Sequence, residues 1–149
     1  MKLGESLAGV TALGVETAPF IYFVERHARY TDLVHAIFDR ADRGEIQIIT
    51  SVITLLEVLV LPIEAGQREL QEQYRAMLLD TLHVVAVPVS AVIAEQAAIL
   101  RAAYRLRTPD ALHIATALSL GCDAFVTNDH ALKRVREIRV IVLDELESD

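Results

Sequence analysis

Four carboxylates in this chain occupy positions at which an α/β sheet gathers side chains into one place. The set comprises Glu16, Glu57, Asp110 and Asp129. Glu16 and Asp129 each follow a short apolar strand, whereas Asp110 opens a helix and Glu57 lies in the helix after another strand. Ligands of such sheets bind in the crevice outside the carboxyl ends of the strands. We therefore expect the four acids to share one site at that edge.

A shared carboxylate site favours a hard cation. Converging carboxylates repel one another, so the site without a cation would be strained and partly protonated. Oxygen-only ligands select Mg²⁺ or Mn²⁺ rather than Zn²⁺, and the chain has no C-x-x-C or H-x-x-x-H spacing. Such ions activate water and stabilise an in-line displacement at phosphorus. The chemistry that suits the four acids is metal-assisted hydrolysis of a phosphodiester.

Glu57 is the most diagnostic of the four because its helix has no obvious polar face. Its neighbours are Val52, Ile53, Leu55, Leu56, Val58, Leu59 and Val60. A lone carboxylate buried among them would have a raised pKa or need a cationic partner. No Lys or Arg lies within a helical turn, so the sequence predicts a metal, a distant Arg or a proton as the partner.

Each acid also has a purely structural interpretation. Glu16 and Asp129 could accept backbone N–H bonds in their turns, and Asp110 could simply favour a helix amino terminus. Glu57 could be a protonated acid in a core. Four independent structural roles would not explain why all four acids are predicted at one sheet edge, whereas one shared metal site would.

The elements that must position these acids alternate along the chain. The sequence predicts strands at residues 10–15, 46–50, 83–87, 124–126 and 139–143, the last at a sheet edge. Helices are predicted between them, with caps at Thr31, Ser90 and Thr108 and a break at Pro62 and Gly66. Strands separated by helices imply parallel pairing and right-handed crossovers. We therefore expect an α/β fold, a three-layer α/β/α sandwich with a mainly parallel sheet of about five strands.

The helix predicted from Gln67 is amphipathic. Leu70, Tyr74, Met77 and Leu78 share one face of it. That face could pack on the sheet or form an interface with a partner, and the pattern does not separate the two.

Length and composition indicate one domain. The 149 residues, 53% of them apolar, suit a single domain over 1–149 with an acidic tail at 144–149. The single cysteine, Cys122, excludes an intramolecular disulfide framework and fits a cytoplasmic location. The amino terminus lacks a signal-peptide pattern, and residues 46–63 are interpreted as a strand running into a helix rather than a membrane span.

The net charge of −7 opposes nucleic-acid binding, because phosphate affinity comes chiefly from Lys and Arg. The basic residues are nevertheless concentrated in the last third of the chain. They are Arg101, Arg105, Arg107, Lys133, Arg134, Arg136 and Arg139. This distribution is equally compatible with an RNA-attracting surface and with an ordinary solvated one.

The order of the acids and the residues around them resemble PIN-domain ribonucleases, especially the VapC-type toxins of prokaryotic toxin–antitoxin pairs. The resembling segments are V-E-T-A-P-F-I-Y-F-V-E, S-V-I-T-L-L-E-V-L, T-P-D-A-L-H-I-A-T-A-L and F-V-T-N-D-H-A-L, within residues 10–143. The resemblance implies a PIN fold, Mg²⁺-dependent (or Mn²⁺-dependent) cleavage of RNA, homodimerisation and inhibition by a small antitoxin protein. It places Glu16, Glu57, Asp110 and Asp129 on the acidic positions. It also places Thr127 and Asn128 on a polar pair that would orient the last acid or a metal-bound water.

One residue departs from the family pattern, which usually has Asp where this chain has Glu16. The extra methylene moves the carboxylate by roughly 1 Å, and misplacement of that size can cost about 10²-fold in rate. We expect metal binding to survive, turnover to be weak, and Glu16→Asp to raise hydrolysis. The alternative function is a catalytically weak or inactive PIN-fold module that binds RNA or protein.

Three further residues are given structural roles. His113 lies on the same helical face as Asp110 and is predicted to be a half-buried structural histidine rather than a phosphate ligand or proton shuttle. Cys122 is predicted to be packed rather than reactive. Ser90 has no local His–Asp partners and is interpreted as a helix cap, not a nucleophile.

Overall fold

The computed structural model describes all residues from 1 to 149. Five strands form one sheet: β1 (Ala12–Val15), β2 (Gln47–Ser51), β3 (Val84–Val87), β4 (Ala124–Thr127) and β5 (Arg139–Val142). The helices are α1 (Leu3–Ser6), α2 (Thr17–Val24), α3 (Thr31–Asp42), α4 (Ile53–Glu64), α5 (Arg68–Leu79), α6 (Ala91–Tyr104) and α7 (Thr108–Ser119). Two short 3₁₀ helices, η1 (His130–Arg134) and η2 (Leu143–Glu145), flank β5.

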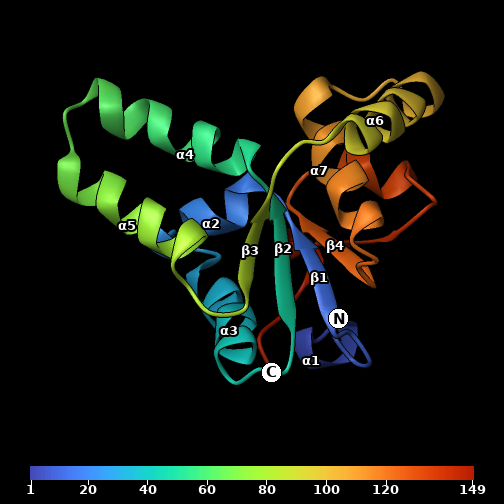
Figure 1. The fold of residues 1–149 in the computed structure, drawn as a ribbon. Helices are drawn as coiled ribbons and strands as arrows, with labels where there is room; N and C mark the ends of the chain where they lie inside the picture. The colour runs from blue at the N-terminus through green and yellow to red at the C-terminus, as the bar shows by residue number, and fades with distance from the viewer.

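The sheet has the strand order β3-β2-β1-β4-β5, and every pair is parallel. Each crossover therefore carries a helix or a 3₁₀ turn. Figure 1 shows α2 to α5 on one face of the sheet and α6 and α7 on the other. The predicted three-layer α/β/α sandwich is confirmed, with β5 at the edge as expected.

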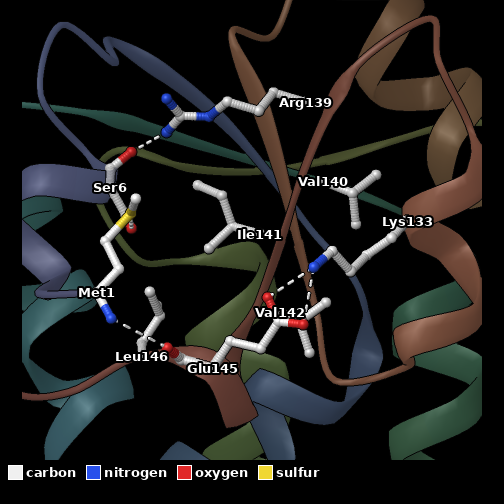
Figure 2. Close-up of a pocket in the computed structure, with 9 residues that line it drawn as sticks. All are labelled: Met1, Ser6, Lys133, Arg139, Val140, Ile141, Val142, Glu145 and Leu146. Atoms are coloured by element: carbon white, nitrogen blue, oxygen red, sulfur yellow. Dashed lines mark hydrogen bonds and ion pairs between the residues drawn. The ribbon is translucent and has the colours of Figure 1, made fainter.

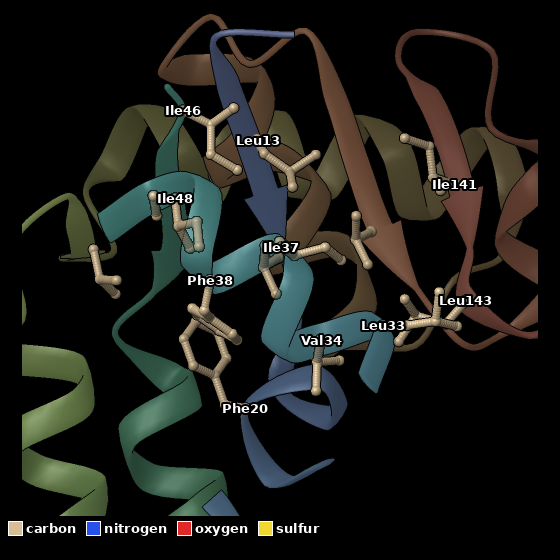
Figure 3. Packing of buried hydrophobic residues seen from close by; sticks show 14 of the residues in the cluster. Leu13, Phe20, Leu33, Val34, Ile37, Phe38, Ile46, Ile48, Ile141 and Leu143 are labelled. Carbon is tan, nitrogen blue, oxygen red and sulfur yellow. The ribbon is translucent and has the colours of Figure 1, made fainter. Parts of the chain in front are cut away.

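Alternating side chains on the strands divide the core between the two faces. In β4, Ala124 and Val126 join the larger cluster under α2, α3 and α5, whereas Phe125 points to the smaller cluster under α6 and α7. This alternation is the period of two of a strand buried on both sides. Figure 3 shows the larger cluster, with Phe20 and Phe38 packed beneath the sheet at a ring-centroid distance of 5.4 Å.

Gly14, in the middle of β1, lets α7 approach the sheet closely. A Cβ built on it would lie 2.6 Å from the Cβ of Ala117 and 3.0 Å from a ring carbon of Phe125. Only glycine fits at this distance. The contact fixes the height of α7, the helix that begins with Asp110, above the sheet.

The predicted break at Pro62 is wrong. Pro62 is buried within the last turn of α4, which continues to Glu64, and the chain reverses only around Gly66, where φ is +66°. A proline close to a helix end removes one backbone hydrogen bond but leaves few residues beyond it to displace.

The cap predicted at Ser90 is confirmed, because its Oγ accepts a hydrogen bond from the Ile93 amide. Those at Thr31 and Thr108 are wrong. Each is the first residue of its helix, and neither helix has a side-chain cap.

The two termini lie together at the amino end of the sheet (Figure 1). Within 144–149, the Glu147 carbonyl accepts the Leu3 amide, and Asp149 accepts the amide of Gly4. A cavity of about 380 Å³ opens between the amino-terminal residues and β5, as Figure 2 shows. It is lined mainly by Val140, Ile141, Val142 and Leu146, and contains none of the four predicted site acids.

The amphipathic face of α5 is part of the core, since Tyr74, Met77 and Leu78 are buried in the larger cluster. Exposed apolar side chains lie elsewhere, among them Leu56, Val60, Leu61 and Ile63 of α4 and Val92 and Ile99 of α6. Residues 46–63 form β2 and most of α4, as predicted, and no helix has the length and apolarity needed to cross a bilayer.

Candidate metal centre

All four predicted acids line one pocket of about 260 Å³. Its lining consists of Glu16, Thr17, Ala18, Ile21, Glu57, Arg107, Pro109, Asp110, His113 and Asp129. The acids come from the ends of β1 and β4, from α4 and from the first turn of α7. The topology brings these four segments together because β1 lies between β2 and β4, and α7 packs across β1 and β2.

Glu16 lies directly after β1, and one of its oxygens is held by the turn after β4. Its Oε1 accepts a hydrogen bond from the Thr127 hydroxyl at 2.6 Å and from the Asn128 amide at 3.1 Å. Burial nevertheless raises the pKa of Glu16, with a smaller contribution from the charge of Asp110, against the lowering effect of these two bonds.

Thr127 and Asn128 therefore support the first acid in this structure, not the carboxylate of Asp129. The Thr127 hydroxyl also accepts the Asp129 amide at 2.9 Å, which links the two acids through one side chain. The Asn128 side chain bonds outside the pocket, to the Tyr22 hydroxyl and the Asp144 amide.

The expectation that Glu57 is buried among apolar residues is wrong. Its side chain is 35% exposed, because α4 covers the sheet only along part of its surface and leaves Leu56 and Val60 in solvent. Its partners are His113 Nε2 at 3.0 Å and Thr17 Oγ1 at 2.8 Å, both on Oε1. The hydrogen bond from His113 is the main reason that the pKa of Glu57 lies below its ordinary value.

Asp110 is buried in the first turn of α7 and paired with Arg107. The Arg107 Nε lies 3.1 Å from Oδ2 and its Nη2 lies 3.4 Å from Oδ1, while 77% of the arginine side chain is exposed. Hydrogen bonding to Asp110 raises the pKa of Arg107, and the charges of Asp129 and Glu16 add to the effect. Arg107 thus partly neutralises the group of acids from the solvent side.

Asp129 caps η1, because its Oδ1 accepts the Ala131 amide at 2.9 Å. In three of the acids, Glu16, Glu57 and Asp129, one carboxylate oxygen is bound by the protein and the other has no hydrogen-bond partner. Such half-engaged carboxylates suit a hard cation, which takes free oxygens from rigidly held ligands. No group of three or more Asp, Glu, His or Cys side chains has the arrangement of a preformed metal site.

The basic residues of the last third do not form a track to the pocket. Arg107 alone among them lines it. Arg101 and Arg134 donate to the carbonyls of Leu106 and Tyr104, and Lys133 is paired with Glu145. Carbonyl bonds and one ion pair therefore hold three of these basic side chains away from the pocket.

Three further residues, Thr17, Arg107 and His113, line the pocket but are not among the predicted site residues. His113 is more buried than predicted, at 4% exposure, and contacts Glu57 across the pocket. Its place in the pocket could have been inferred from its spacing of three residues from Asp110, which puts both side chains on one helical face. By contrast, Cys122 is packed as expected, and burial raises the pKa of its thiol to about 12.

The raised pKa of Glu16 predicts a specific dependence of stability on pH. A carboxyl group with a higher pKa in the folded chain binds its proton more tightly there, so the fold loses stability as pH rises through the ordinary and then the folded value. We expect Glu16→Gln to remove this loss, giving a higher Tm than wild type at neutral pH without divalent ions. Thermal unfolding of both proteins from acidic to neutral pH measures the difference. A wild-type Tm that falls no more than the variant's over this range contradicts it.

The fold and the pocket define an α/β protein with four acids at the carboxyl edge of a parallel sheet. The PIN-domain family model matches residues 15–138, which is most of the chain. The chain therefore belongs to the PIN-domain family. A sequence comparison with curated proteins finds no significant match.

Three solved structures are similar in fold. A toxin–antitoxin complex from Klebsiella pneumoniae is 24% identical with a TM-score of 0.64, covering 89% of this chain and 98% of its own. VapBC2 from Rickettsia felis, bound to a DNA fragment from its promoter, is 17% identical with a TM-score of 0.69 and the same coverage. DNA-bound VapBC from Salmonella typhimurium is 16% identical with a TM-score of 0.63, covering 90% and 98%.

Proposed function

We propose that this protein is a Mg²⁺- or Mn²⁺-dependent endoribonuclease and the toxin of a toxin–antitoxin pair. The observation that carries the proposal is the meeting of Glu16, Glu57, Asp110 and Asp129 in one pocket of a PIN-domain chain. The similar VapBC and toxin–antitoxin complexes support the assignment to the toxin class.

The donor set fits a hard divalent cation. Glu16, Glu57, Asp110 and Asp129 would hold it, and when bound it activates water and stabilises in-line displacement at a phosphodiester. Thr127 holds Glu16, while Thr17 and His113 hold Glu57. Arg107 offers the pocket an exposed guanidinium, whose planar donors suit a phosphate oxygen.

The activity is tested by incubating the purified protein with a single-stranded RNA and with DNA of the same sequence. We expect the RNA to be cleaved internally with Mg²⁺ or Mn²⁺ and left intact when EDTA is added. Cleavage that survives EDTA removes the metal from the mechanism. Equal cleavage of the DNA removes the proposed substrate class.

The competing function is a PIN-fold module that binds RNA or protein without catalysis. The pairing of Arg107 with Asp110 favours it, because a cation must displace this guanidinium or share the carboxylate with it. Calorimetric titration with Mn²⁺ separates the two functions. Saturable binding supports the nuclease, and RNA binding without Mn²⁺ binding supports the module.

Glu16→Asp tests whether the longer acid limits turnover. We expect faster cleavage, by up to about 10²-fold, if the pocket suits a carboxylate one methylene closer to β1. The rate per bound metal ion, measured at saturating Mn²⁺, is the relevant quantity. An unchanged or lower rate means that the bonds from Thr127 and Asn128 to Glu16 are the working geometry of this chain.

An antitoxin and a second copy of the chain are the proposed partners. The exposure of Leu56, Val60 and Ile63, whose spacing places them on one face of α4, supports a protein partner, since neighbouring apolar side chains on a surface mark interaction sites. Sedimentation of the chain alone tests the homodimer, which monomers at micromolar concentration would contradict. Co-expression with the product of a neighbouring short reading frame tests the antitoxin, and separate elution of the two chains would argue against it.

A further inference from the structure

We propose that His113 is a positioning residue, which sets the orientation of Glu57 for metal binding without contacting the ion. The inference rests on the proposed function of the acidic pocket. It assigns His113 a role in the site in place of the structural role that its sequence context suggests.

Glu57 needs an external constraint because its own helix does not provide one. Its side chain is 35% exposed, and a glutamate free to rotate loses entropy when a ligand orders it. Thr17 and His113 both bond to Oε1, at 2.8 and 3.0 Å, and leave Oε2 without a partner. Two donors on one oxygen fix the plane of the carboxylate and keep the other oxygen available to a cation.

The environment of His113 selects the tautomer that can act in this way. Its ring is almost completely buried, and Nδ1 has no hydrogen-bond partner. A proton on Nδ1 would be a buried donor without a partner, whereas an unprotonated nitrogen at that position costs less free energy. The favoured tautomer therefore carries its proton on Nε2, which faces Glu57 Oε1 at 3.0 Å and the Thr17 hydroxyl at 3.2 Å.

The fold ties this contact to the rest of the site. His113 follows Asp110 by one turn of α7, and Gly14 allows α7 to sit firmly on β1. A single helix thus places Asp110 directly and Glu57 through the imidazole. On the other side, Thr17 links to Thr54 at 3.3 Å, which in turn bonds to Thr50 of β2 at 2.8 Å. The donors to Glu57 are thereby connected to the sheet as well.

The test compares His113→Leu, which removes the donor, with His113→Gln, whose side-chain amide can donate from near the Nε2 position. Loss of an outer partner of a metal ligand typically costs about 10–100-fold in affinity or activity. We expect a loss of that size in Mn²⁺ affinity for the leucine variant and recovery of most of it in the glutamine variant. His35→Leu, an exposed histidine on α3 away from the pocket, is the control and should bind Mn²⁺ as wild type does.

Nitrogen-15 NMR of the metal-free wild type provides a readout independent of activity, and should show the His113 proton on Nε2. A proton on Nδ1 overturns the inference, as does a leucine variant with wild-type Mn²⁺ affinity. It also fails if the folded glutamine variant binds as weakly as the folded leucine variant, with folding checked by circular dichroism. Mn²⁺ binding without RNA cleavage overturns the proposed activity alone, whereas no Mn²⁺ binding by wild type overturns the activity and the inference together.

Discussion

Asp110→Asn is expected to reduce metal-dependent RNA cleavage by more than about 10²-fold, because it removes a proposed ligand rather than an outer partner, whose loss alone costs about 10–100-fold. Asp110 is the most buried of the four acids and lies in the first turn of α7. Asparagine keeps the shape of the side chain but loses its charge. It also leaves the Arg107 guanidinium without its ion pair, which adds unbalanced positive charge to the pocket.

The matched control is Asp32→Asn, which removes an acid from the first turn of α3 at an exposed position outside the pocket. Both variants lose a favourable charge at a helix amino terminus, typically about 0.3–1 kcal/mol. Initial cleavage rates at saturating Mn²⁺, with thermal unfolding as a check on the fold, separate the two effects. If Asp110→Asn cleaves as fast as Asp32→Asn, Asp110 is a helix-terminal charge and not part of a catalytic site.

Gly14→Ala is expected to have the largest effect on the fold. The new methyl group would lie 2.6 Å from the Cβ of Ala117, a separation at which the strand or the helix must move. Both atoms are attached directly to the backbone, so no side-chain rotation can relieve the contact. Overpacking of this kind costs about 1–3 kcal/mol of unfolding free energy, occasionally more.

The same substitution is expected to impair the site at a distance. A shift of α7 carries Asp110 and His113 with it, and misplacement by about 1 Å can cost about 10²-fold in rate. Urea denaturation and RNA cleavage measure the two consequences. The double variant Gly14→Ala with Ala117→Gly removes the contact with the Ala117 Cβ and leaves only the Phe125 ring carbon at 3.0 Å, at a helix-propensity cost of about 1 kcal/mol, so it should recover most of the cleavage. If the single and double variants are equally active, the height of α7 does not control the pocket.

Patterns local in the chain determined the class of fold and the candidate acids. Strands flanked by helices predict a parallel sheet, and the acids at 16 and 129 follow predicted strands whatever the tertiary packing. These predictions succeeded because hydrophobic periodicity and turn residues act over a few neighbouring positions. The wrong prediction of a helix break at Pro62 also came from a local pattern. A proline near a helix end is tolerated when tertiary contacts bury it.

Contacts between distant segments were decided only by the tertiary structure. Nothing within a helical turn of Glu57 indicates that His113, 56 residues away, donates to it, or that α4 leaves its apolar side chains exposed. Likewise, the Thr127 hydroxyl donates to the carboxylate of Glu16, 111 residues away, and not to the carboxylate of Asp129, two residues away. The order of strands decides such pairings, because β1 between β2 and β4 brings their following residues to one edge. The sequence by itself therefore determined which carboxylates could meet, and the packing of α4 and α7 across the sheet decided which side chains hold them.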